Sequence, residues 1–479
     1  LMAWTTDGMA QTTFVNLTPK PKQMTVSEGQ LSLPSDFVVS YTDADAAMVD
    51  EMNRFVQVYN VAAGAQASVA QSQPGALMQV EKFASSAKRA AGAYKVKVTA
   101  DQVKLTADDA LGLFYAFQTV KKMLPANVMA GVYEAKNTVY ALPLVDITDE
   151  PRFEYRGFML DVSRHFFTVE EVKRMLDIMA YYKMNRFHWH LSDDQGGRVE
   201  IKKYPKLTSV GSIAPNVMFT DMYTCTQYWK NEPYGPYFYT QDEIRDVVAY
   251  AQNLHIEIVP EIDMPGHFVA AMASYPEYSC YPNGNHTIWS TGGISSDVLN
   301  VANPAAVQFA KDILGELIEL FPYETIHIGG DECPTTAWEG NAECQARYQE
   351  LGLTNYRQLQ SHFIKEMADF VQSKGRKLAV WNEAITAGSA DTETVKSTGA
   401  LVYCWTGPEA AARKAAELGL KNIYTPWGPY YINRRQGTSP LDPPGAGDGT
   451  DDVRKTYNQA IPSETDYGVQ GTYWTEHGS

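Results

Sequence analysis

The chain has 479 residues, more than one hydrophobic core usually organises, so its length favours one large domain and a smaller companion. Its 40 basic and 56 acidic residues give a formal net charge of -16, which disfavours nucleic acid and anionic membrane surfaces as partners. The apolar fraction of 44% is ordinary for a globular protein, and no apolar run is long enough for insertion across a membrane.

Residues 16 to 145 hold the first predicted elements. Stretches such as FVVSY and YKVKVTADQVKLTA alternate apolar and polar residues, which predicts strands, and amphipathic helices are predicted near residues 44 to 62 and 107 to 123. The first residues lack a basic region followed by an apolar run, so no intact signal peptide is expected there. We predict an α+β domain over residues 1 to 145, and the Pro-containing polar stretch LPLVDITDEPRFEYRG then separates it from the rest.

From Arg156 onward, eight apolar runs of strand length alternate with segments of helical periodicity. The runs are RGFMLDVS, MNRFHWHL, HIEIVPEID, TIHIGGDE, KLAVWNE, ALVYCW, KNIYTP and GVQGTYWTE. This alternation is typical of the α/β class, and we predict a (β/α)₈ TIM barrel over residues 146 to 479. The eighth run ends three residues before Ser479, so the last helix of the ring is missing and the native protein is expected to be longer.

Polar and aromatic residues gather at the ends of the predicted strands, where TIM barrels carry their working side chains. They are Asp161, Arg164, His188, His190, Asp193, Asp194, Glu261, Asp263, His267, Asp331, Glu332, Trp381, Glu383, Trp405, Trp474 and Glu476. An Asp-Glu dipeptide is by itself more often a solvated turn. Asp331 and Glu332, however, follow the apolar strand TIHI and two glycines, which leave room for a ligand beside both carboxyls.

Two carboxyls supply what glycoside hydrolysis needs, an acid for the leaving oxygen and a group that stabilises positive charge at the anomeric carbon. Adjacent residues cannot easily face each other across a sugar ring, as an acid and a nucleophile do. Asp331 and Glu332 therefore fit better a mechanism in which one is the acid and the other orients a nucleophile that belongs to the substrate.

The chain resembles glycoside hydrolase family 20, the β-N-acetylhexosaminidases, over most of its length. The resemblance rests on several motifs in the family's order: RGFMLDVSRHF, FHWHLSDDQG, VPEIDMPGH, HIGGDE, a late YIN segment and a closing YWTE. It implies retaining, exo-acting removal of a terminal non-reducing β-linked GlcNAc or GalNAc, with no metal and no organic cofactor. We expect a periplasmic or secreted protein, although the first residues would suit an intracellular chain equally.

The resemblance also implies roles for the matching residues. Glu332 would be the general acid/base, Asp331 would bind the acetamido N–H and direct its oxygen to the anomeric carbon, and Tyr431 would hold that oxygen. The other matching residues would surround the sugar: Arg164 and Glu476 at its outer hydroxyls, Trp381, Trp405 and Trp474 as pocket walls, and Asp193 and His267 behind Glu332.

Two places depart from the family's usual pattern. Gly197 stands after DDQG where a bulky aromatic residue is common, so the following loop must pack differently. Asn433 and Arg434 stand where many relatives carry an acidic residue two positions after the tyrosine. Replacing a carboxylate by a guanidinium lowers the electrostatic cost of a sulfate, so activity on 6-sulfated terminal GlcNAc is a further hypothesis.

Other interpretations stay open. The protein could be a carbohydrate-binding barrel without catalysis, or a transglycosylating or disaccharide-releasing relative. Individual residues also have structural alternatives. A metal ion could be bound by His188, His190, Asp193 and Asp194, and Arg164 could pair only with Asp161 or with a helix end. The tryptophans could only fill the core, and Cys225 and Cys280 could form a disulfide or remain thiols.

Overall fold

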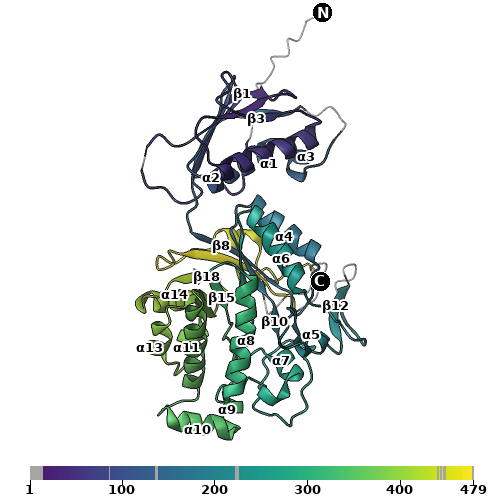
Figure 1. The fold of residues 1–479 in the computed structure, drawn as a ribbon, viewed down its shortest axis with the longest axis vertical. Helices are drawn as coiled ribbons and strands as arrows, with labels where there is room; N and C mark the ends of the chain where they lie inside the picture. The colour runs from purple at the N-terminus through teal and green to yellow at the C-terminus, as the bar shows by residue number, and fades with distance from the viewer. Residues whose placement is uncertain are drawn as a thin grey trace, which may run out of the picture. The chain divides into compact units, whose positions relative to one another are not determined.

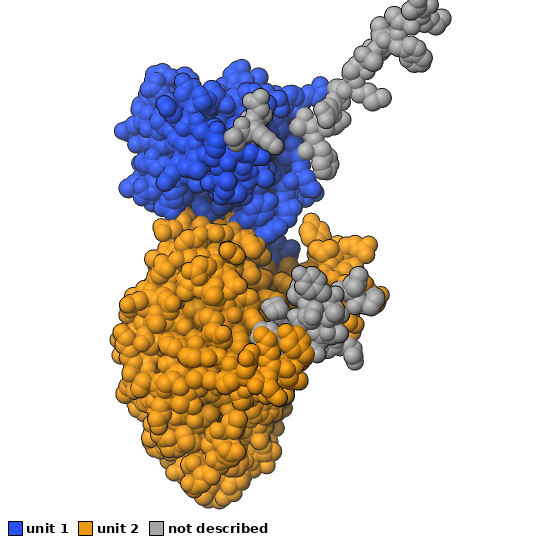
Figure 2. All heavy atoms as spheres, turned by 90° about the vertical axis from the view of Figure 1, so that its right-hand side faces the viewer, with its two compact units in different colours: residues 1–154, 181–183 blue, residues 155–180, 184–479 orange. Residues whose placement is uncertain are grey.

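The computed structural model describes residues 15–85, 87–134, 139–221, 226–439, 442, 445 and 449–476. The chain divides into two compact units, one of residues 1–154 and 181–183 and the other of residues 155–180 and 184–479 (Figure 2). The boundary expected between residues 145 and 146 falls inside strand β7 (Ala141–Asp149), which belongs to the sheet of the first unit. Among the described residues, no helix is long and apolar enough to cross a membrane.

The first unit is a seven-stranded mixed sheet with helices on it. Its strand order is β1 (Gln23–Ser32), β7, β5 (Tyr94–Val98), β6 (Val103–Ala107), β4 (Met78–Glu81), β2 (Val38–Tyr41) and β3 (Ser68–Gln71). The helices are α1 (Ala46–Ala63), α2 (Ala110–Met123) and α3 (Ala126–Ala130), and the first two begin where the Asp45 and Asp109 side chains accept backbone N–H groups. Phe55 and Phe117 stack between α1 and α2 with ring centroids 4.4 Å apart. The predicted α+β organisation of this region is therefore observed.

The second unit is a closed barrel of eight parallel strands, so the predicted TIM barrel is confirmed (Figure 1). In barrel order the strands are β8 (Tyr155–Asp161), β9 (Arg186–His190), β14 (Glu257–Glu261), β15 (Thr325–His327), β16 (Lys377–Trp381), β17 (Leu401–Cys404), β18 (Asn422–Tyr424) and β19 (Gly468–Tyr473). Because parallel strands all end at the same side of a barrel, the polar residues that follow them are brought to one mouth.

Helices surround the barrel, and each buries one apolar stripe against it. The main ones are α4 (Val169–Tyr181), α6 (Gln241–Asn253), α8 (Pro304–Leu320), α11 (Arg357–Ser373) and α14 (Pro408–Glu417). Helix α6 begins with a capping box between Thr240 and Glu243, and α8 begins with Asn303 as cap and Pro304 in its first turn. The shorter helices are α5 (Lys206–Ser209), α7 (Val269–Ser274), η1 (Pro276–Tyr278), α9 (Thr336–Gly340), α10 (Ala342–Glu350), α12 (Glu383–Thr386), α13 (Thr392–Ser397) and α15 (Val453–Tyr457).

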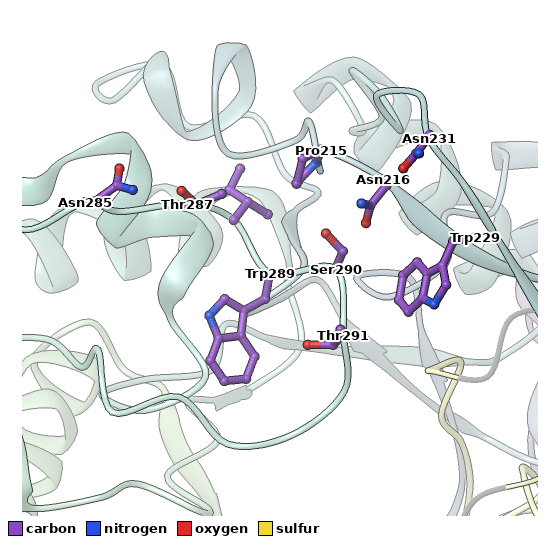
Figure 3. Close-up of a pocket in the computed structure, with 10 residues that line it drawn as sticks. Pro215, Asn216, Trp229, Asn231, Asn285, Thr287, Trp289, Ser290 and Thr291 are labelled. Atoms are coloured by element: carbon purple, nitrogen blue, oxygen red, sulfur yellow. The ribbon is translucent and has the colours of Figure 1, made fainter.

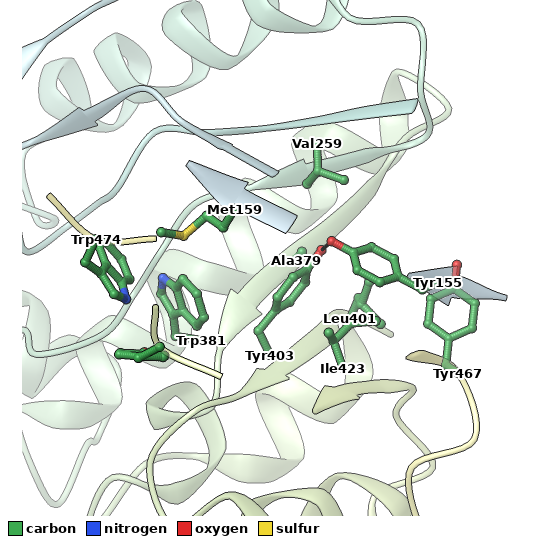
Figure 4. Packing of buried hydrophobic residues seen from close by; sticks show 11 residues of the cluster. Tyr155, Met159, Val259, Ala379, Trp381, Leu401, Tyr403, Ile423, Tyr467 and Trp474 are labelled. Atoms are coloured by element: carbon green, nitrogen blue, oxygen red, sulfur yellow. Dashed lines mark hydrogen bonds between the residues drawn. The ribbon is translucent and has the colours of Figure 1, made fainter. Parts of the chain in front are cut away.

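The barrel interior is filled by aromatic side chains (Figure 4). Trp381 and Trp474 lie at one end of this cluster and Tyr155 and Tyr467 at the other, with Tyr403 between them. The Tyr403 hydroxyl donates to that of Tyr155 at 3.1 Å, so the interior layers are joined by hydrogen bonds as well as by packing. The tryptophans mark the end at which the strands run out into the functional loops.

Candidate active site

The loop after β15 places two carboxyls side by side on a strained turn. Gly329 and Gly330 have φ angles of 67° and 90°, and a Cβ at Gly329 would lie 1.8 Å from Asp263 Oδ1, so only glycine fits there. Glu332 itself has a φ of 41°, a left-handed conformation that costs a non-glycine residue about 1–3 kcal/mol. Backbone strain of this kind concentrates at functional sites.

Asp331 points into the protein and contacts a second acid. Its side chain is buried next to the carboxyl of Asp263, and its Oδ1 has no hydrogen-bond partner among the described residues. Burial, and then the charge of Asp331, raises the pKa of Asp263 well above its usual range. Burial also raises the pKa of Asp331, against the opposing effect of the His267 charge.

Glu332 is the more accessible of the two adjacent acids, with 36% of its side chain exposed. His267 Nε2 lies 3.3 Å from Glu332 Oε2, and its Nδ1 lies 3.1 Å from Asp193 Oδ1 and 3.0 Å from Asp194 Oδ2. Burial disfavours the imidazolium, yet the charge of Asp193 and the hydrogen bonds raise the pKa of His267 well above its usual range. A cationic His267 thus links two buried carboxylates to Glu332.

Asp193 and Asp194 are held by a two-residue hairpin. In it, β10 (Ser192–Asp193) pairs with β11 (Gly196–Gly197), and Gly197 N–H donates to Gly211 O at 2.9 Å. A Cβ at Gly197 would lie 3.3 Å from Leu207 O, so the chain packs closely at the position where an aromatic residue is usual in the family.

A buried network around Glu261 lies beneath these groups. Glu261 Oε2 is 2.9 Å from His188 Nε2 and 2.5 Å from His190 Nδ1, and its Oε1 is 3.0 Å from His327 Nδ1 and accepts from Trp381 Nε1 at 2.7 Å. Burial opposes ionisation of Glu261, but the charges of His190 and His327 hold its pKa well below its usual range. The same contacts raise the pKa of His190 to about 10 against the effect of burial, whereas burial lowers the pKa of His188 to about 4.

Three groups of ligand-type atoms lie close enough to hold a metal ion: His188, Glu261 and His327; Asp193, Asp194 and His267; and His267, Asp331 and Glu332. In the first, Glu261 already accepts hydrogen bonds from His190 Nδ1 and Trp381 Nε1. The other two share His267, and a metal ion there would have to displace a proton from it, because a metal-binding imidazole is deprotonated.

Arg164 is buried among acceptors, one of which, Asp193, it shares with His267. Its guanidinium lies 2.7 Å from Asp193 Oδ2 and 3.2 Å from Asp161 Oδ2, and its Nε donates to Gln195 Oε1 at 2.7 Å. Glu476 Oε1 is 4.0 Å away. The pairing with Asp161, raised as an alternative from the sequence, is present, but it is one of several contacts that fix the guanidinium beside Glu476.

Four aromatic side chains form a continuous wall next to Asp331. Trp405 stacks on Tyr431 with centroids 6.2 Å apart, Tyr431 lies 6.1 Å from Trp474, and Trp474 lies 5.9 Å from Trp381. Burial raises the pKa of Tyr431 well above its usual range, and the nearby carboxylates, Asp331 most of all, raise it further. The phenol therefore stays a hydrogen-bond donor. Trp381 has no exposed surface and is the base of the wall.

Glu383 is a residue at this wall to which sequence reasoning gave no role. Its Oε2 accepts from Trp405 Nε1 at 2.8 Å, which fixes the indole plane. Burial, and then the charge of Asp331, raises the pKa of Glu383 to about 8. Its position directly after the strand KLAVW was the only available signal.

Arg434 has a partner that the sequence did not reveal. The guanidinium is buried and forms an ion pair with Asp451, which also pairs with Lys455, and its Cζ lies 4.8 Å from the Trp427 ring centroid. The Arg434 cation is therefore paired within the protein. Asp451 offsets only one of the two cations that pair with it, so the electrostatic basis for binding a sulfate is weaker than an unpaired Arg434 would give.

Comparison with known proteins identifies the family. The model of glycosyl hydrolase family 20, catalytic domain, matches residues 153–479, and the model of domain 2 of that family matches residues 15–150. The chain belongs to glycosyl hydrolase family 20. The family predicted from the motifs is thus confirmed, and so is the order of its two domains.

Several relatives of this family 20 chain are named β-hexosaminidases. It is 39% identical over 389 residues to a beta-hexosaminidase of Porphyromonas gingivalis, covering 78% of this chain and 46% of that protein. It is 35% identical over 353 residues to one of Vibrio furnissii, covering 74% and 54%. The chain therefore spans about half the length of these curated relatives.

Among solved structures, the GH20 exo-β-N-acetylglucosaminidase of Vibrio harveyi in complex with N-acetylglucosamine matches with a TM-score of 0.80. The identity is 30%, and the match covers 96% of this chain and 69% of that one. The Flavobacterium johnsoniae chitobiase matches with a TM-score of 0.74 and 29% identity, covering 96% and 65%.

The family 20 barrel brings most of the predicted site residues into one connected set. Hydrogen bonds, ion pairs and ring contacts join Arg164, Asp193, His267, Asp331, Glu332, Trp381, Trp405, Tyr431, Trp474 and Glu476. Arg434 is directed to Asp451, and Asn433 Oδ1 is buried without a hydrogen-bond partner among the described residues. The roles of the individual side chains in binding and catalysis stay predictions.

Proposed function

We propose that this chain is a retaining exo-β-N-acetylhexosaminidase that removes a terminal, non-reducing β-linked GlcNAc. The observation that carries the proposal is the pair Asp331 and Glu332, one buried next to Asp263 and the other partly exposed. Neighbouring acids on one turn cannot flank a sugar as the separated carboxyls of an ordinary glycosidase do. They can, however, act on two parts of the same substrate.

In the proposed reaction, Glu332 donates its proton to the glycosidic oxygen as the bond to the anomeric carbon breaks. The acetamido oxygen of the same sugar forms the new bond to that carbon, so the intermediate is an oxazolinium ring. Asp331 accepts the acetamido N–H and stabilises the positive charge, and Tyr431 donates to the acetamido oxygen. Glu332 then takes a proton from water, which attacks the anomeric carbon and opens the ring.

Two successive inversions at one carbon give net retention. The acetamido oxygen attacks from the face opposite to the leaving group, and water enters from the face that the leaving group vacated. The wall of Trp405, Tyr431 and Trp474 supports selection of 2-acetamido sugars, because an apolar enclosure favours the acetamido methyl.

The test is release of 4-nitrophenol from its β-N-acetylglucosaminide by the wild type, Glu332→Gln and Asp331→Asn. We expect both variants to lose about 10²–10⁴-fold in kcat, the range for removing a positioned proton donor or a stabiliser of transition-state charge. NMR of the first product should show the β-anomer. A folded wild type that binds GlcNAc without turnover would instead support the carbohydrate-binding alternative, and sugar transfer in place of hydrolysis would support the transglycosylase.

A further inference from the structure

A groove outside the predicted site is bordered by the exposed Trp229 and the partly buried Trp289 (Figure 3). It has a volume of about 640 Å³ and lies between the hairpin of β12 (Val217–Asp221) and β13 (Thr226–Lys230) and the segment 285–291 that follows β14. Trp229 comes from the hairpin and Trp289 from the segment, with Ser290 and Thr291 between the two indoles. The volume is within the range of about 300–1,000 Å³ that small-molecule sites usually have.

The chemistry of the lining is that of a neutral polar ligand. All ten lining residues are uncharged, and three of them are asparagines, Asn216, Asn231 and Asn285, whose amides both donate and accept hydrogen bonds. Trp229 leaves 46% of its surface exposed, so its indole is accessible to a ligand. Flat apolar faces next to amides and hydroxyls match the apolar faces and hydroxyl rims of pyranose rings.

The groove is joined to the residues around the proposed acid. Trp289 N–H donates to Asp194 O at 3.2 Å, Asp194 Oδ2 lies 3.0 Å from His267 Nδ1, and His267 Nε2 lies 3.3 Å from Glu332. On the neighbouring residue, Gln195 donates to Thr291 O at 2.8 Å while accepting from Arg164. The segment that lines the groove is therefore fixed to the side of the site on which His267 contacts the acid.

We propose that this groove binds the reducing-side sugars of a neutral glycan whose terminal GlcNAc is cleaved at Glu332. The inference rests on the proposed function and extends it from the terminal sugar to the chain that follows it. The leaving group of a glycosidase departs past its acid, and the groove segment is joined to that acid through Trp289, Asp194 and His267. Stacking on Trp229 and Trp289 holds the second and later sugars and gives the protein a preference for oligosaccharide over a single glycosylated aryl group.

The experiment compares kcat/KM on β-1,4-linked GlcNAc tetramer and on 4-nitrophenyl β-N-acetylglucosaminide for the wild type, Trp229→Ala and Tyr228→Ala. Tyr228 is the matched control, because it neighbours Trp229 on β13, is also 46% exposed, and points to the other face of the strand, away from the groove. We expect Trp229→Ala to lose about five- to tenfold on the tetramer and less than about twofold on the aryl substrate. Tyr228→Ala should leave both values unchanged.

If Trp229→Ala changed kcat/KM equally on both substrates, or on neither, the proposal that the groove binds sugars would be wrong. The proposed function would be unaffected. A wild type that is inactive on both substrates would reject the proposed function but not the groove. The groove is then tested by measuring ligand binding instead of turnover. In that case tryptophan fluorescence is titrated with the tetramer and with free GlcNAc. Quenching by the tetramer that is absent in Trp229→Ala supports the site, and quenching that persists in that variant rejects it.

Discussion

The Glu383 carboxyl is a group whose charge is set by its surroundings, because burial and the charge of Asp331 raise its pKa to about 8. In the unfolded chain the pKa returns to about 4.5, so the protonated folded form contributes its full stability below pH 4.5. That stability is lost progressively as the pH rises through 8. Glu383→Gln keeps an acceptor for Trp405 without the carboxylate, and we expect its Tm to exceed that of the wild type at pH 9.

The Tm difference between Glu383→Gln and the wild type should shrink as the pH falls towards 4.5. Thermal unfolding at pH 5, 7 and 9 measures it, and Glu393→Gln serves as a control because its carboxylate is 76% exposed. A difference that does not change with pH would mean that Glu383 is already ionised in the folded protein at neutral pH.

Single residues also show what a sequence can and cannot reveal about such a site. Asp331, Glu332 and the tryptophans were predicted because each follows an apolar run of strand length, and barrel geometry brings strand ends together. The raised pKa of Asp263 and the pairing of Arg434 with Asp451 were not predictable. Both depend on contacts between separate loops, and no periodicity in the sequence encodes such contacts.

The loops at the barrel mouth are held together by Arg198, which sequence reasoning passed over. Arg198 is fully buried, and its guanidinium donates to the carbonyl oxygens of Ser163 at 2.6 Å, Ser212 at 2.9 Å and Tyr237 at 3.1 Å. Burial lowers its pKa to about 10, so the cation persists at neutral pH. One side chain thus fixes the loop after β8, which carries Arg164, to the segment before the β12–β13 hairpin and to the segment after it.

Arg198→Met should be strongly destabilising, because it leaves several buried carbonyls without donors, each worth about 1–3 kcal/mol. We expect a loss of roughly 3 kcal/mol or more in the free energy of unfolding from urea titration, with a raised KM because Arg164 loses its support. Arg245→Met on α6 is the control, since that side chain is 52% exposed and its pair with Asp242 lies at the surface. Equal stability of the two variants would contradict the role of Arg198.

Regular elements were predicted far better than short ones. The helical segment EEVKRMLDIMAYY corresponds to α4, and the runs around β8, β9 and β16 contain the observed strands, because each repeats its apolar period over a whole element. Strand β7 was instead taken for a linker because it contains Pro143. This proline pairs with Gln30 where the register of β1 shifts, and such irregularities tolerate a residue that cannot donate a hydrogen bond.

The whole molecule carries a formal net charge of -16, which bears on the hypothesis of a 6-sulfated substrate. An anionic sugar approaching this protein meets long-range repulsion, and the Arg434 cation that could offset it is paired with Asp451. We therefore expect kcat/KM for the 6-sulfated aryl β-N-acetylglucosaminide to be lower than for the unsulfated one. The screening length falls from about 30 Å at 0.01 M salt to about 8 Å at 0.15 M. Added salt should therefore reduce the difference in kcat/KM between the two substrates.

Both aryl substrates are assayed at these two salt concentrations, with Asp451→Asn as the variant that separates local from overall charge. Removing the Asp451 carboxylate leaves Arg434 unneutralised, so activity on the sulfated substrate should rise relative to the unsulfated one while the salt dependence stays similar. A wild type that prefers the sulfated sugar at low salt would show that Arg434 acts as a sulfate ligand despite its ion pair. The sequence pattern of Asn433 and Arg434 would then be a better guide to specificity than the charge balance of the loop.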